Sequence, residues 1–193
     1  MKFPKVIGLC GVARSGKDTF CETALSLFKE QGLKAHRISF ADALKNDVKD
    51  FLLDKVGISP FTNKDSEKDV IRDFLVAYGT KLMRKIDQNY WISKVQEQVR
   101  TNMENDEISI FTDIRYENEI DWIQEELDGY CIHITRKSPS GNAVPPANPD
   151  EEQNDPILYS KSDAQLVWAT MEDQDVLRYV VLNELNSLMP ALA

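Results

Sequence analysis

The feature that most constrains the fold is a glycine-rich loop between a short apolar run and an amphipathic stretch. The run Val6–Cys10 is typical of a buried parallel strand, and a helical period covers residues 17–31. The loop between them fits the pattern G-x-x-x-x-G-K through Gly11, Gly16 and Lys17. Glycines at these places let successive N–H groups point inward around an anion. The sequence therefore predicts a phosphate-binding loop.

This loop is expected to bind a nucleoside triphosphate. Lys17 is a mobile cation that would reach the β- and γ-phosphates, and the following helix adds its positive end. The predicted ATP contacts are Gly11, Ala13, Arg14, Ser15, Gly16, Lys17, Asp18 and Thr19.

Asp18 stands where a Ser or Thr hydroxyl usually ligates Mg²⁺. A carboxylate is also a hard oxygen ligand, so Asp18 is a candidate Mg²⁺ ligand, and the hydroxyl of Thr19 is a second one. The alternative is that Asp18 only places a favourable negative charge in the first helical turn.

Strands and helices alternate along the rest of the chain. Further strands are expected at residues 34–38, 107–112, 130–134 and 165–169, and further helices at 41–56, 66–82, 90–103, 117–127 and 176–189. A capping box from Ser66 to Asp69 would open the third helix. Such alternation predicts an α/β fold, a five-stranded parallel sheet with helices on both faces, whose ligands bind at the carboxyl ends of the strands.

Residues 137–158 break this alternation. They include five of the eight prolines and show neither a helical nor a strand period. A long stretch of this kind is usually a functional lid or a disordered segment. We expect one domain over residues 1–193, with a lid at about 136–160 and a helical acceptor-binding region at about 40–105.

Charged residues near the expected strand ends are candidates for phosphoryl transfer, which is mostly positioning and charge stabilisation. Asp113 follows the third strand, where an acid would lie near Mg²⁺ or an acceptor, and Arg136 follows the fourth. Arg115 and Glu119 are either functional residues or a simple i,i+4 ion pair. The candidate catalytic residues are Lys17, Arg14, Arg136 and Asp113.

The predicted third helix carries Arg72 and is followed by Arg84 and Trp91. On a continuous helix the two arginines would lie about 18 Å apart, too far to hold one phosphate together. Charges in such positions usually form a solvated face. A tryptophan such as Trp91 is more often a core residue than a platform for a base.

Four blocks together resemble the deoxynucleoside monophosphate kinases of tailed bacteriophages: Gly11–Thr19, Arg72–Thr80, Tyr90-Trp91 and Thr112–Glu119. The resemblance implies a P-loop NTPase fold of the nucleoside monophosphate kinase type. It also implies transfer of the γ-phosphoryl group of ATP to a deoxynucleoside 5′-monophosphate with Mg²⁺. The chain departs from the family pattern in having Val76 for a glutamine, Lys81 for an acid, and no histidine-containing segment after residue 136.

The resemblance also implies roles for individual residues. Lys17, Arg14 and Arg136 would serve the triphosphate, and Asp18 and Thr19 would serve the metal. The acceptor would be bound by Arg84, Trp91, Asp113, Arg115 and Glu119, and Arg72 is a further candidate for the acceptor side.

Composition bounds the partners. The net charge of −9 argues against a duplex nucleic acid as a partner. The sequence contains no run of about 18 or more apolar residues, so no membrane-spanning helix is expected. We expect small-molecule nucleotides as partners, a homodimer as an option, and a cytoplasmic location, in the host cell if the chain is phage-encoded. The alternatives are another small P-loop kinase, such as one acting on dephospho-coenzyme A, and a non-catalytic nucleotide-binding regulatory or assembly protein.

Overall fold

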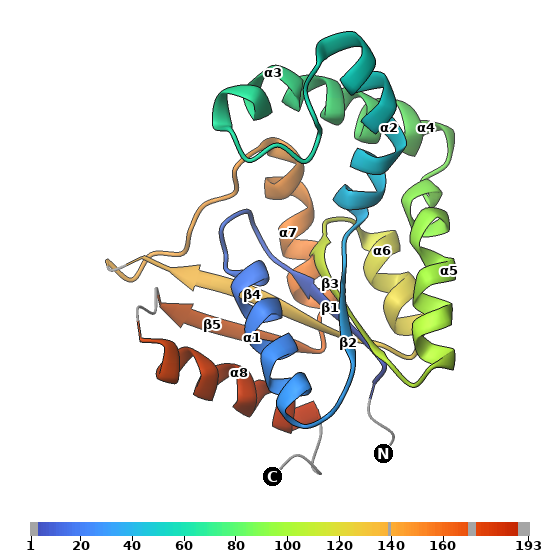
Figure 1. Cartoon of the computed structure of the whole chain (residues 1–193). Helices are drawn as coiled ribbons and strands as arrows, with labels where there is room; N and C mark the ends of the chain where they lie inside the picture. The colour runs from blue at the N-terminus through green and yellow to red at the C-terminus, as the bar shows by residue number, and fades with distance from the viewer. Residues whose placement is uncertain (1–3, 139, 170–172, 189–193) are drawn as a thin grey trace. The chain divides into compact units, whose positions relative to one another are not determined.

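The computed structural model describes residues 4–138, 140–169 and 173–188 (Figure 1). The chain divides into two compact units. The first comprises the residues up to Ile38 and those from Val99 onward, and the second is Ser39–Gln98. In the part of the chain that the structure describes, no helix is long and apolar enough to cross a membrane.

The first unit is built on a five-stranded sheet in the order β2-β3-β1-β4-β5, and all neighbouring strands run parallel. The strands are β1 Val6–Cys10, β2 Ala35–Ile38, β3 Ile108–Ile114, β4 Tyr130–Lys137 and β5 Ala164–Ala169. Every residue of the central strand β1 is buried, which explains its continuous apolar sequence. The predicted five-stranded parallel sheet is confirmed.

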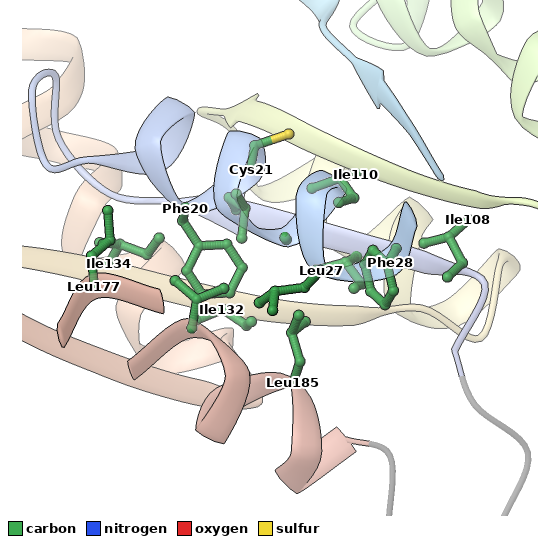
Figure 2. Packing of buried hydrophobic residues seen from close by; sticks show 14 of the residues in the cluster. Phe20, Cys21, Leu27, Phe28, Ile108, Ile110, Ile132, Ile134, Leu177 and Leu185 are labelled. Carbon is green, nitrogen blue, oxygen red and sulfur yellow. The ribbon is translucent and has the colours of Figure 1, made fainter. Parts of the chain in front are cut away.

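Helices cover both faces of this sheet. One face carries α1 (Lys17–Glu30) and α8 (Gln174–Leu188), and the other carries α6 (Glu117–Asp121), its π-helical continuation η2 (Trp122–Glu126) and α7 (Pro149–Lys161) (Figure 1). Figure 2 shows the core of the first face, where α1 and α8 pack on β3 and β4 through Phe20, Leu27, Phe28, Ile110, Ile132, Ile134, Leu177 and Leu185.

The second unit is helical. It contains α2 (Phe40–Val56), α3 (Asp65–Val76), the π-helix η1 (Ala77–Met83), α4 (Arg84–Ile86) and the start of α5 (Tyr90–Glu104). The indole N–H of Trp91 donates to the carbonyl of Gly79 at 3.1 Å. A Cβ on Gly79 would lie 2.1 Å from the Leu44 side chain, so α2 and η1 approach each other closely there. Two of the sequence blocks that carry the family resemblance therefore contact each other.

Several predicted boundaries were wrong. The helix α3 begins at Asp65 after Lys64, which makes no side-chain cap, so Ser66 lies inside the first turn and opens no capping box. The strands β3 and β4 run on to Ile114 and Lys137, so Asp113 and Arg136 lie within the strands and not after them. The cause is that polar side chains near the ends of these strands interrupt the apolar pattern on which the prediction depends.

The helix α7 was also missed, because residues 137–158 were expected to have no regular structure. The residues that α7 turns toward the sheet are mostly polar. Glu151 bonds to the glycine-rich loop, Asp155 to His133, and Ser162, which caps the helix, to Cys10. Only Leu158 is a buried apolar residue of this helix. A helix whose inner face is polar gives no apolar period to detect.

Candidate active site

The phosphate-binding loop joins β1 to α1 in a conformation that its glycines permit. Gly11 and Gly16 have φ angles of 123° and 101°, a region that favours glycine. A Cβ on Gly11 would lie 2.3 Å from the carbonyl oxygen of Ile134, and one on Gly16 would lie 2.4 Å from the ring of Trp168. Both glycines are therefore required by backbone conformation and by the lack of space.

Trp168, near the end of β5, packs against the loop at Gly16 and is hydrogen-bonded to it. Its indole N–H donates to the carbonyl of Ser15 at 2.8 Å, and both residues are buried. The residue beside it in β4, Arg136, donates to the carbonyl of Arg14 at 3.4 Å. Sequence reasoning placed Arg136 here but missed Trp168, because the contact joins residues 153 positions apart.

Lys17 lies over the loop. Its ammonium donates to the carbonyls of Gly11 and Val12, each at 2.7 Å. Burial lowers the pKa of Lys17, and the positive charge of Arg115 lowers it further, against the opposing effect of Glu151. A half-buried ammonium whose main partners are neutral carbonyls is only partly compensated, so it favours an incoming anion.

Oxygen ligands for a divalent cation lie next to the loop. Asp18 and Thr19 are exposed in the first turn of α1, and the Asp18 carboxylate lies 3.7 Å from the guanidinium of Arg37. Asp113 is half-buried near the end of β3, which pairs with β1, and beside it the buried hydroxyl of Thr112 has no hydrogen-bond partner among the described residues. Mg²⁺ commonly binds one or two carboxylates together with substrate phosphates and waters. These groups fit such an ion.

A metal held by the protein alone is not indicated. Among residues 4–138, 140–169 and 173–188, no group of three or more His, Cys, Asp or Glu side chains is arranged to hold one. The buried residues Cys10, Cys21 and Cys131 are free thiols.

Glu119 fixes the turn that follows β3. It is 2 % exposed, and its carboxylate accepts hydrogen bonds from the backbone N–H groups of Arg115, at 2.8 Å, and Tyr116, at 3.1 Å. The bond from Tyr116, the N-cap residue, belongs to a capping box at the start of α6. The structure thus gives Glu119 a role that the sequence did not indicate, which is to hold the backbone from which the Arg115 side chain projects.

Glu151 completes the surroundings of the loop. One carboxylate oxygen accepts hydrogen bonds from the backbone N–H groups of Ala13, at 3.1 Å, and Ala147, at 3.0 Å. The other lies 3.8 Å from the guanidinium of Arg115. Sequence reasoning missed this residue, although Asn148 with an acid three positions later is a helix-start signal that would have found it.

The other predicted acceptor residues belong to the second unit. Arg72 is exposed on α3 and pairs with Asp69 at 3.1 Å, and Arg84 is half-buried at the start of α4. Trp91 is 4 % exposed, and its indole is engaged by Gly79. Within the first unit the structure does bring together the loop, Arg115 and Arg136, as the sequence predicted.

Comparisons with known proteins point the same way. The model of a family described as deoxynucleotide monophosphate kinase matches residues 20–144, nearly two thirds of the chain. A dephospho-CoA kinase from Campylobacter jejuni has a similar structure, with a TM-score of 0.56 and 16% identity over 98% of this chain and 99% of that chain. This likeness supports the P-loop kinase fold. A comparison with curated proteins gives no match.

Proposed function

The chain belongs to the deoxynucleotide monophosphate kinase family, and we propose that it transfers the γ-phosphoryl group of ATP to deoxynucleoside 5′-monophosphates. The products are ADP and the deoxynucleoside diphosphate. Family membership makes the chain a phosphotransferase that acts on nucleotides. The observation that carries the proposal is the match over residues 20–144, because it begins just after the loop and therefore supports a kinase independently of the loop.

On the donor side, backbone N–H groups of Gly11–Thr19 bind the triphosphate. Lys17 leaves the loop carbonyls and contacts the β- and γ-phosphates, which supply the charge partner it lacks. The Arg136 guanidinium donates to the backbone carbonyl of Arg14, and we assign the guanidinium groups of both residues to the charge on the migrating phosphoryl group.

Mg²⁺ would neutralise charge on the phosphate oxygens and orient the triphosphate. Asp18 and Thr19 are the residues we assign to it, with Asp113 as a further carboxylate near the end of the neighbouring strand. Asp18 is 73% exposed in its side chain, so it can reach an ion or one of its waters without desolvation.

On the acceptor side, we assign Arg115 to the phosphate of the monophosphate. It projects from the turn that Glu119 fixes, and its guanidinium contacts the same carboxylate that bonds to the phosphate loop. Asp113, Arg72, Arg84 and Trp91 remain the other assigned acceptor residues. The expected partners are nucleotides, with a second copy of the chain as an option, and the expected location is the cytoplasm, that of the host cell if the chain is phage-encoded.

An acceptor panel tests the reaction. Purified protein with Mg-ATP is incubated with each common deoxynucleoside monophosphate and with dephospho-coenzyme A, and ADP release is measured. We expect turnover with at least one deoxynucleotide. Turnover with dephospho-coenzyme A alone would replace the proposed substrate class, and tight ATP binding without turnover on any acceptor would favour a non-catalytic protein.

Arg115→Ala tests the acceptor assignment. It should lower turnover and raise the KM for the monophosphate while sparing ATP binding, because the guanidinium is assigned to the acceptor. Arg100→Ala, an exposed arginine on α5, is the matched control for the loss of one positive charge. Unchanged kinetics in Arg115→Ala would contradict the assignment.

A further inference from the structure

Glu151 places a carboxylate where a phosphate is expected to bind. Its Oε2 accepts a hydrogen bond from the Ala13 N–H of the glycine-rich loop at 3.1 Å, and its Oε1 lies 3.8 Å from Arg115. Its negative charge also acts on Lys17. The carboxylate thus interacts with three groups of the kind that bind phosphate: a loop N–H, a guanidinium and an ammonium.

The rest of α7 is anchored elsewhere. The carboxylate of Asp155, one turn later, is hydrogen-bonded to the imidazole of His133 at 3.0 Å. At the far end of the helix, the hydroxyl of Ser162 is hydrogen-bonded to the thiol of Cys10 at 3.1 Å. Residues 145–150, which precede Glu151, are exposed. The first turn of α7 can therefore change its contacts while the anchored remainder of the helix stays in place.

We propose that Glu151 is an internal competitor of the nucleotide, which occupies the phosphate loop in the free enzyme and is displaced when the triphosphate binds. The inference rests on the proposed function, because it takes the loop to be the triphosphate site. Two anions cannot share the Ala13 N–H, and their like charges repel in a half-buried site. Displacement also releases Arg115 from the carboxylate, which makes its guanidinium available to a phosphate only when the donor nucleotide is in place.

Only molecules whose loop is free of Glu151 can bind the triphosphate. The apparent Kd is therefore the intrinsic Kd divided by the fraction of such molecules. The competition by Glu151 also couples the occupancy of the donor site to the first turn of α7. Glu151 thus determines the affinity for the donor and links the donor loop to the residue assigned to the acceptor.

The test uses Glu151→Gln in the full-length protein. The N-cap of α7 is Asn148, which accepts from the backbone N–H of residue 151, and the amide oxygen can still accept from the Ala147 N–H, so the start of the helix is retained while the negative charge beside Ala13 is removed. Binding of ADP, tripolyphosphate and adenosine is measured by calorimetry without an acceptor. Glu152→Gln, at the exposed neighbouring position, is the control for the change in net charge.

We expect Glu151→Gln to bind ADP and tripolyphosphate about tenfold more tightly than wild type, since the competing anion is gone, with little change for adenosine. Glu152→Gln should change none of the three by more than about twofold. Unchanged or weaker binding of both phosphate ligands by Glu151→Gln would overturn the inference, as would an equal gain in Glu152→Gln. If wild type itself binds neither ADP nor tripolyphosphate, the proposed function fails first.

Discussion

Trp168→Phe tests how the phosphate loop is held in place. Phenylalanine keeps an aromatic ring beneath Gly16 but removes the indole N–H that donates to the carbonyl of Ser15 at 2.8 Å. Ser15 is fully buried, so water cannot replace the lost donor. Leaving a buried acceptor unsatisfied costs about 1–3 kcal/mol, and the smaller ring adds a packing loss of about 1 kcal/mol.

The assay measures two quantities on the same variant. Denaturant unfolding should show a free energy of unfolding lower by about 2–4 kcal/mol, the sum of these two terms. Calorimetry should show weaker ATP binding, because the Ser15 peptide lies within the loop that must present its N–H groups together. The loss in affinity should persist at temperatures where the variant is fully folded.

Trp122→Phe is the matched control. Trp122 is similarly buried but packs against Phe111, on the face of the sheet opposite α1, with ring centroids 5.8 Å apart. It should lose stability without losing ATP affinity. Wild-type ATP binding in Trp168→Phe, or an equal loss in both variants, would refute the reasoning.

Three further predictions concern the loop, the second unit and the thiols. Gly16→Ala should abolish ATP binding, measured by calorimetry, because φ is 101° and the new Cβ would lie 2.4 Å from the Trp168 ring. Burial raises the pKa of Asp47, but hydrogen bonds from Tyr78, Lys94 and Tyr90 outweigh it and hold the pKa below its usual 3.8. The stabilisation is therefore present above about pH 4 and lost as pH falls through the lowered pKa. In Asp47→Asn the free energy of unfolding should therefore depend less on pH in that range. A pH dependence equal to that of wild type would contradict the stabilising role of the Asp47 carboxylate. Burial raises the pKa of Cys10 and Cys21 to about 12, so a thiol reagent at pH 8 should label them only as fast as the protein unfolds, and rapid labelling would contradict their burial.

The sequence predicted the sheet well because its strands and their covering helices follow simple periods. The apolar run Val6–Cys10 and the stripe of α1 face the same core, and each carries its own pattern. The order of the strands needed the structure, since no local pattern says that β1 lies between β3 and β4. The π-helical turns could not be predicted from the sequence either, because the α-helical and π-helical periods differ too little to be distinguished over five to seven residues.

The candidate site divides in a similar way. The loop and its lysine have a local signature that depends only on glycine conformation and spacing. The contacts of Glu151 and Trp168 with this loop join residues 138 and 153 positions apart, so no local pattern predicts them. The Asn148 helix-start signal marks Glu151 as a residue of a first helical turn, but not as a partner of the loop. For Glu119 the sequence left open a functional role and an i,i+4 ion pair with Arg115. The structure adds hydrogen bonds from the backbone N–H groups of Arg115 and Tyr116, which neither alternative predicted.

The most direct test of the proposed function identifies the product. Wild-type protein is incubated with Mg-ATP and one deoxynucleoside monophosphate at a time, and the reaction is followed by ³¹P NMR. We expect the α- and β-phosphate signals of a deoxynucleoside diphosphate to grow in equal amount with those of ADP. Inorganic phosphate as the only new phosphorus product, or no change in the monophosphate signal for every acceptor, would contradict the proposed reaction.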